Sequence, residues 1–81
     1  MIIKTFFHSY FKELAGCSET VSELEPGSSI ADLLKLLYRQ FPRLEEMKRS
    51  TLIAVGLEYQ KGDYPLREGD EVSLFPPVQG G

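Results

Sequence analysis

Few side chains in this sequence are able to build a conventional catalytic or metal site. The 81 residues include one cysteine, Cys17, one histidine, His8, and no tryptophan. A single thiol cannot form an internal disulfide, and one Cys with one His is too few for the usual zinc ligand set. Glycine-rich phosphate-binding motifs are also missing. We therefore expect a chain that binds no metal and no cofactor by itself and has no autonomous active site.

The sequence also lacks the features that nucleic-acid-binding and membrane proteins share. Nine Lys and Arg stand against twelve Asp and Glu, a net charge of -3, and the basic residues are scattered along the chain. A phosphate-binding surface needs clustered positive charge. No apolar run is long enough to span a bilayer, and the N-terminus lacks a signal-peptide pattern. We expect a cytoplasmic protein that binds neither nucleic acid nor membrane.

Residue patterns indicate several strands and one main helix. Alternation and β-branched or aromatic content predict strands at residues 2–8, 20–24, 51–55, 57–61 and 71–75. Apolar residues at helical spacing predict a helix from Ile30 to Phe41, capped by Ser28 or Ser29 and ended by Pro42. Shorter helical turns are expected at 10–16 and 43–48. Gly69 is the turn residue most in need of a positive φ.

The order of these elements predicts the fold. A lone amphipathic helix must bury its apolar stripe against a sheet face. The compact solution is a mixed sheet wrapped over the helix, with the first and last strands adjacent in the middle. We therefore expect an α+β, ubiquitin-like β-grasp domain at residues 1–75, with a mixed sheet of about five strands on one main helix. A flexible, extended Gly-Gly tail is expected at residues 76–81.

The tail is the part of the sequence that points most directly to a function. It consists of Pro76, Pro77, Val78, Gln79, Gly80 and Gly81. The prolines end the last strand and favour an extended chain, so the tail spans roughly 20 Å. Glycine has no Cβ, so it fits a narrow channel and leaves its carbonyl carbon open to attack. The tail predicts delivery of the Gly81 carboxylate into another protein; the alternative is an idle chain end.

Three segments resemble the MoaD/ThiS family of sulfur carriers. Residues 12–16, Lys-Glu-Leu-Ala-Gly, resemble the family's Arg-Glu-Leu-Ala-Gly segment, and residues 63–72 resemble its penultimate turn. Residues 75–81 are similar to the Phe-Pro-Pro-Val-x-Gly-Gly ending of the molybdopterin synthase small subunits in this family. One departure is Gly56, which follows Val55 where the family commonly has Asn.

The resemblance implies a sulfur carrier in molybdenum or tungsten cofactor biosynthesis. A ubiquitin-activating-type adenylyltransferase would use ATP to adenylate the carboxylate of Gly81. A sulfur donor protein would then convert the acyl-adenylate to a thiocarboxylate. The charged tail would enter the large subunit of molybdopterin synthase, in a heterotetramer, and donate its sulfur to the pyranopterin precursor. By this resemblance, ATP is used by the activating partner.

Other functions share the same fold and tail. One alternative is a ubiquitin-like modifier that is joined to lysines of target proteins. Another is a sulfur carrier for a different thio-pathway, such as thiamin, cysteine or tRNA thiolation; the thiamin-pathway carriers usually lack the Pro-Pro. A third is a plain β-grasp binding module.

A carrier that meets successive partners needs a docking face. Phe6 and Phe75 are aromatic residues in phase with polar neighbours on the first and last strands, so we expect them close together on the face away from the helix. His8 is in phase with Phe6, and Tyr59 lies on the fourth predicted strand. Because interfaces favour aromatic anchors, we predict Phe6, His8, Tyr59 and Phe75 as partner-binding residues. The alternative is that these are ordinary exposed aromatics.

Overall fold

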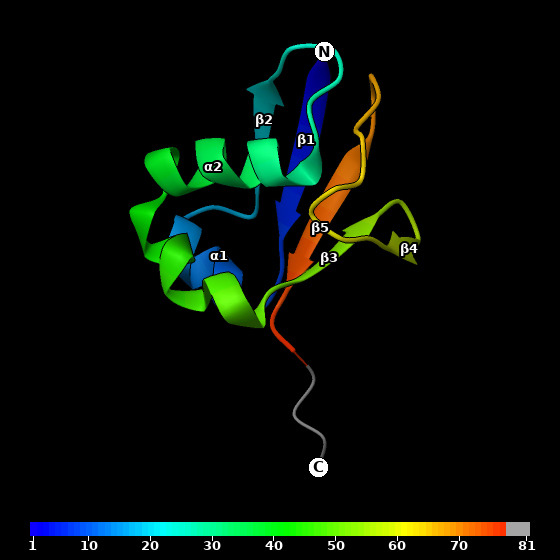
Figure 1. Ribbon diagram of the computed structural model, residues 1–81. Helices are drawn as coiled ribbons and strands as arrows, with labels where there is room; N and C mark the ends of the chain where they lie inside the picture. Colours follow the sequence, from blue (N-terminus) through cyan, green and yellow to red (C-terminus); the bar gives the residue numbers. More distant parts are fainter. Residues whose placement is uncertain (78–81) are drawn as a thin grey trace.

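A five-stranded mixed sheet carries the helices of this protein on one of its faces (Figure 1). The computed structural model describes residues 1–77. The elements in chain order are β1 (Ile2–Phe7), α1 (Tyr10–Ala15), β2 (Glu19–Glu23), α2 (Ile30–Gln40), the 3-10 helix η1 (Pro42–Ser50), β3 (Leu52–Val55), β4 (Glu58–Tyr59) and β5 (Glu71–Phe75). Within residues 1–77, no helix has the length and apolar character needed to cross a membrane.

The strand order β2-β1-β5-β3-β4 places the first and last strands side by side. β1 and β5 run parallel, and the other three pairs are antiparallel. This is the ubiquitin-like β-grasp arrangement, and the prediction made from the order of elements is confirmed. The strand limits differ slightly from those expected, since β2 begins one residue earlier and β4 has only two residues.

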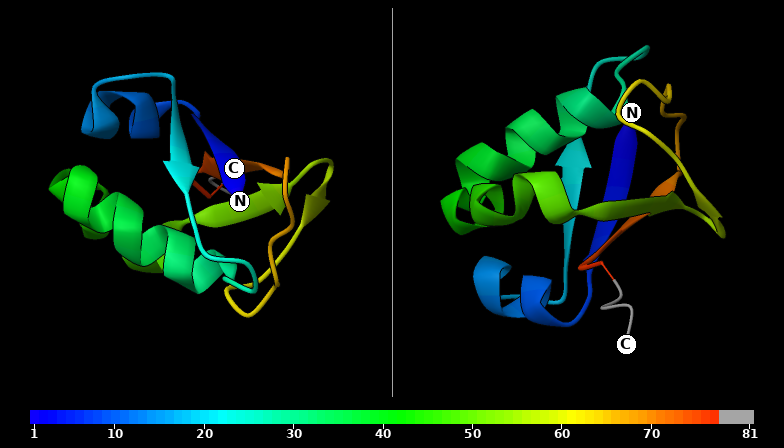
Figure 2. Two further views of the ribbon diagram at one scale, coloured as in Figure 1. Left: turned by 90° about the horizontal axis from the view of Figure 1, so that it is seen from above. Right: turned by 60° about the horizontal axis from the view of Figure 1, so that its bottom comes forward.

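The apolar stripe of α2 forms the centre of the core. Ile30, Leu33 and Leu37 of this helix are fully buried. They belong to the same buried cluster as residues of the two central strands, Ile3, Phe7, Val72 and Leu74. Figure 2 shows α2 crossing one side of the sheet, with α1 and η1 in the same layer. Burying each large aliphatic side chain contributes about 1.5–3 kcal/mol.

A capping box fixes the start of α2. The Ser29 hydroxyl accepts a hydrogen bond from the backbone N–H of Asp32 at 3.3 Å, and the Asp32 carboxylate accepts one from the backbone N–H of Ser29 at 2.9 Å. Of the two serines that the sequence offered as caps, Ser29 is therefore the one used. The carboxylate also accepts a hydrogen bond from the Ser29 hydroxyl at 3.2 Å. The backbone N–H and then the hydroxyl of Ser29 favour the ionised carboxylate, so they hold the pKa of Asp32 below its ordinary value.

The helical layer continues past Pro42 further than the sequence predicted. The expected turn at 43–48 is a 3-10 helix over Pro42–Ser50, with Pro42 in its first turn and a kink at Met47. Leu44 is buried and secures η1 to the core. The result is a second helical segment that packs beside α2.

Two glycine turns have the backbone conformation that the sequence required. Gly69 has a φ of 85°, as predicted. Gly56, between β3 and β4, has a φ of 62°, which is in the left-handed region. Glycine adopts this region freely, and asparagine more easily than most other residues. The departure from Asn to Gly at position 56 therefore preserves the turn.

We expect Leu37→Ala to lower the free energy of unfolding by about 2–5 kcal/mol, because it leaves a cavity in the core under α2. Urea denaturation monitored by circular dichroism measures the change. Lys35→Ala, an exposed position on the same helix, is the matched control and should stay within about 0.5 kcal/mol of the parent. Equal effects of the two substitutions would contradict this account of the core.

The lowered pKa of Asp32 predicts a pH-dependent contribution of the capping box. A carboxyl group whose pKa is depressed by folding stabilises the folded state above its ordinary value of 3.8, and this contribution disappears as the pH falls through the folded-state pKa. Asp32→Asn should therefore be less stable than the parent at pH 7, and the difference should shrink progressively below pH 3.8. Urea denaturation over a pH series measures both values.

Ser29→Ala provides the control for this experiment. In that background the carboxylate has already lost one partner, so Asp32→Asn should have a smaller effect at pH 7. A stability difference that does not change with pH would rule out the capping-box explanation.

Candidate functional site

The sheet face opposite α2 carries the predicted partner-binding residues. Ile3, Thr5 and Phe7 of β1 are buried, so the alternate residues of this strand point to the other face. Strand register extends that face across the sheet, because paired residues of neighbouring strands share a face. We call it the outer face; it is formed by Glu19, Val21, Glu23, Ile2, Lys4, Phe6, His8, Glu71, Ser73, Phe75, Leu52, Ala54 and Tyr59.

Three of the predicted residues meet in one aromatic cluster. The rings of His8 and Phe75 are stacked, with centroids 4.4 Å apart and an interplanar angle of 11°. Tyr59 approaches Phe75 edge-on, with centroids 6.4 Å apart. Tyr59 is 69% exposed, whereas His8 and Phe75 are half-buried. The cluster of His8, Tyr59 and Phe75 therefore joins three strands that are far apart in sequence.

Phe6 lies on the same face but in the next row of side chains. In the parallel pairing of β1 with β5, Phe6 is level with Ser73 and Phe7 is level with Leu74, so His8 reaches the level of Phe75. The ring stacked on Phe75 is consequently His8, a pairing that was not predicted, and Phe6 shares the expected face with Phe75. The Lys4 ammonium lies 5.8 Å from the Phe6 ring centroid and 3.6 Å from the Glu19 carboxylate.

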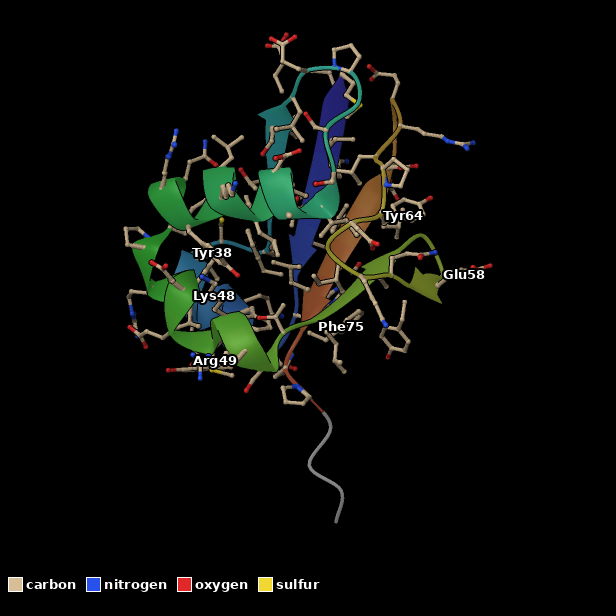
Figure 3. All side chains as sticks on the ribbon, in the orientation of Figure 1. Tyr38, Lys48, Arg49, Glu58, Tyr64 and Phe75 are labelled. Atoms are coloured by element: carbon tan, nitrogen blue, oxygen red, sulfur yellow. The ribbon has the colours of Figure 1, made fainter. Side chains whose placement is uncertain are left out.

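The aromatic cluster stands where the tail leaves the sheet. Phe75 is the last residue of β5, and Figure 3 shows it at the end of that strand. Pro76 and Pro77 follow, and proline has no N–H to continue a strand ladder. The backbone N–H of His8 donates to the carbonyl of Leu74 at 3.2 Å, which ties β1 to β5 at this point. The predicted tail residues Val78, Gln79, Gly80 and Gly81 lie outside the described residues.

The outer face also carries exposed apolar residues that were not predicted as partner-binding residues, among them Ile2 of β1, which is 46% exposed. Val21 of β2 is 55% exposed and Leu52 of β3 is 36% exposed. Leu52 is paired with Phe75, so it borders the aromatic cluster directly. Val21 alternates with Ser22, and the structure shows that Ser22 is the buried one of the two. Leu52 shows no such alternation, because its predicted strand is apolar nearly throughout.

The histidine and the cysteine of the described part of the chain make packing contacts. Over residues 1–77, no group of three or more His, Cys, Asp or Glu is placed to hold a metal ion. The His8 ring uses its face against Phe75, and its Nε2 atom is buried without a hydrogen-bond partner in the same part of the chain. Cys17 packs against the core cluster. These contacts make His8 and Cys17 packing residues in this structure.

Known proteins resemble this chain in sequence and in structure. The profile of the ThiS family matches residues 6–81. A "molybdopterin synthase sulfur carrier subunit" from Chlamydomonas reinhardtii is 32% identical over 83 residues, which cover all of both chains.

Among solved structures, a "putative molybdopterin converting factor, subunit 1" from Pyrococcus furiosus has a TM-score of 0.83 and 29% identity, over 96% of this chain and 99% of that one. A complex of "subunit 1 and 2 of Molybdopterin-converting factor" from Helicobacter pylori contains a chain with a TM-score of 0.73 and 24% identity, covering all of both chains. The fold, the full-length sequence match and the family profile agree, and this chain belongs to the ThiS family.

Proposed function

We propose that this protein is a sulfur carrier that serves as the small subunit of molybdopterin synthase. The observation that carries the proposal is the match, along the whole of both chains, to a relative named as the sulfur carrier subunit of that enzyme. The chain's own ending agrees with this role, because it closes with Pro76-Pro77 as a spacer and Gly80-Gly81 as a small, unbranched terminus.

The proposed chemistry takes place at the terminal carboxylate. A C-terminal carboxylate is ionised at neutral pH and resists nucleophiles, so it needs activation. A ubiquitin-activating-type adenylyltransferase transfers AMP from ATP to the carboxylate of Gly81 and releases pyrophosphate. A sulfur donor protein then supplies a sulfur nucleophile, which attacks the acyl carbon, expels AMP and leaves a thiocarboxylate. ATP is thus bound by the activating partner.

The second partner in the proposal is the large subunit of molybdopterin synthase. The Helicobacter pylori relative was solved together with the second subunit of its factor, which supports a two-subunit assembly for this chain as well. The outer face docks on the large subunit through the aromatic cluster and Phe6. The tail then enters the active site of that subunit, where the terminal sulfur passes to the pyranopterin precursor. A heterotetramer contains two such carriers.

Adenylation of Gly81 is the first test of this function. With the activating enzyme and ATP, the full chain should support ATP–pyrophosphate exchange, and a chain lacking Gly80 and Gly81 should not. Intact mass spectrometry of protein isolated from its own cells should show an oxygen-to-sulfur exchange at the C-terminus. Circular dichroism of the shortened chain is the control for folding.

Two outcomes of that experiment would overturn the carrier function. One is exchange that persists in the shortened chain, which would separate activation from the terminus. The other is the appearance of adducts on lysines of other proteins that vanish on deletion of Gly81, in the absence of any thiocarboxylate. The second outcome identifies a ubiquitin-like modifier.

The docking role of the outer face predicts that Tyr59→Ala and Phe75→Ala each weaken binding to the large subunit by roughly 10–100-fold. Buried aromatic anchors commonly dominate the free energy of such interfaces, and both side chains stand beside the tail. Isothermal titration calorimetry measures the affinity.

Tyr10→Ala is the matched control, because Tyr10 is 43% exposed but lies on α1, in the helical layer. Its affinity should equal that of the parent, and equal losses at all three positions would contradict the assignment.

A further inference from the structure

Helix α2 has a second stripe of residues that the core does not use. Ala31, Leu34, Lys35, Tyr38 and Arg39 follow one another at alternating steps of three and one, which places them along one side of the helix. This side looks onto η1, and together with Glu45 and Lys48 of η1 it lines an open groove of about 560 Å³. We call it the α2–η1 groove.

The groove has an apolar floor and a basic rim. Leu34 and Tyr38 are half-buried and pack against the core cluster, so their outer surfaces form the floor. Lys35, Arg39 and Lys48 are exposed around it. Burial, and secondarily the negative charge of Glu45, raises the pKa of the Tyr38 phenol. The ordinary pKa of tyrosine, 10.0, already keeps the Tyr38 phenol neutral at physiological pH, so its O–H is present as a hydrogen-bond donor.

The positive charge of this acidic protein is concentrated around the groove. Residues 35–49 contain five cations and two carboxylates, a net charge of +3. The other residues contain four cations and ten carboxylates, a net charge of -6. Five of the nine basic residues, which the sequence analysis treated as scattered, thus fall in one segment that forms the end of α2 and η1 on the helical side. Figure 3 shows Tyr38, Lys48 and Arg49 on this side, away from Phe75 and Glu58.

The cations of the rim are not neutralised by ion pairs within the described part of the chain. The salt bridge found there joins Lys4 and Glu19, on the outer face. Glu45 is the single carboxylate of the groove, against three cations. The groove therefore presents excess positive charge around an apolar strip from Ala31 to Tyr38, about 10 Å long, the length of seven residue steps along a helix.

We propose that the α2–η1 groove binds an acidic segment of a partner protein, in which carboxylates flank an apolar side chain. The apolar side chain packs on Leu34 and Tyr38, and the carboxylates pair with Lys35, Arg39 and Lys48. Charge complementarity favours an acidic segment over the alternatives. The rim cations would repel a basic segment, and an uncharged segment would leave these cations without partners. The elongated apolar floor distinguishes a peptide from a small anion, which would use the rim alone.

The position of the groove has a consequence for a carrier. The groove lies in the helical layer. The aromatic cluster lies on the outer face, and it includes Phe75, the residue that precedes the tail. A partner bound at the groove leaves the outer face and the tail accessible to a second protein. This consequence rests on the proposed carrier function, but the binding of an acidic segment does not.

The test uses the full chain and a synthetic peptide probe. The peptide has the sequence Asp-Glu-Leu-Asp-Phe-Glu-Asp-Leu, and nuclear magnetic resonance of the ¹⁵N-labelled protein follows its binding. We expect chemical-shift changes centred on α2 and η1, and an affinity that falls as ionic strength rises. A peptide with Ser in place of Leu and Phe tests the floor, and one with Lys in place of Asp and Glu tests the rim. Both should bind at least about tenfold more weakly.

Charge-reversal variants locate the site on the protein. K35E/K48E should weaken binding of the acidic peptide by roughly tenfold or more, because two rim cations become repulsive. K12E/K61E is the matched control: it makes the same change in net charge at two exposed lysines outside the groove, and it should stay within about twofold of the parent. A chain lacking Gly80 and Gly81 should bind the peptide normally, which separates this result from failure of the carrier function.

Three outcomes would overturn the proposal. Equal weakening by the two double variants would mean that net charge alone attracts the peptide. Equal binding of the Ser-substituted peptide, or the same shifts with inorganic phosphate, would mean a simple anion site. Shift changes confined to the outer face would place the peptide elsewhere.

Discussion

The parallel pairing of β1 with β5 is the contact on which the rest of this structure depends. It joins the two ends of the chain in the middle of the sheet, and the buried residues of both strands meet the apolar stripe of α2. Its register places His8 level with Phe75 and so builds the stacked pair at the end of β5. A slip of one residue would reverse the faces of β5 and send Phe75 into the core. One strand register therefore sets both the packing of the core and the position of Phe75, after which the tail begins.

The sheet separates two surfaces of different chemistry. The outer face is aromatic and aliphatic around His8, Tyr59 and Phe75, and it borders the root of the tail. The helical side is basic around an apolar strip between α2 and η1. Because α2 buries one stripe and leaves another beside η1, a single 11-residue helix contributes both to the core and to a surface groove. A domain of 81 residues has a small core, so any surface on it that recognises a partner must be an open one.

The periodicity of the sequence was enough to predict the fold, because each helix and strand could be recognised from residues that lie close together in the chain. The helix followed from its apolar spacing and its capping serine, and the order of elements left one compact arrangement. Register was not accessible in the same way. The stacking of His8, and not Phe6, on Phe75 depends on which residues of two distant strands face each other. The groove was missed for a similar reason: Lys35 and Arg39 are neighbours on α2, but Lys48 joins them only because η1 packs against that helix.

In the proposed carrier, delivery of the terminus to a partner depends on how firmly the chain is held at Phe75, the last residue of β5. Ordering a chain segment inside a partner costs conformational entropy. This loss weakens binding less when part of the segment is already ordered in the free protein. Here Phe75 is held by the β5 ladder and by rings on two sides, and the two prolines that follow restrict the backbone further. The direction in which the chain leaves the sheet is therefore fixed before any partner binds. Glycine occupies the last two positions of the sequence, and in the proposed carrier its small size serves the chemistry at the carboxylate. If the chain were mobile at Phe75, the same terminal carboxylate would be bound by a partner at a higher cost in conformational entropy. The β-grasp sheet lowers this cost, because its central strand β5 ends at Phe75.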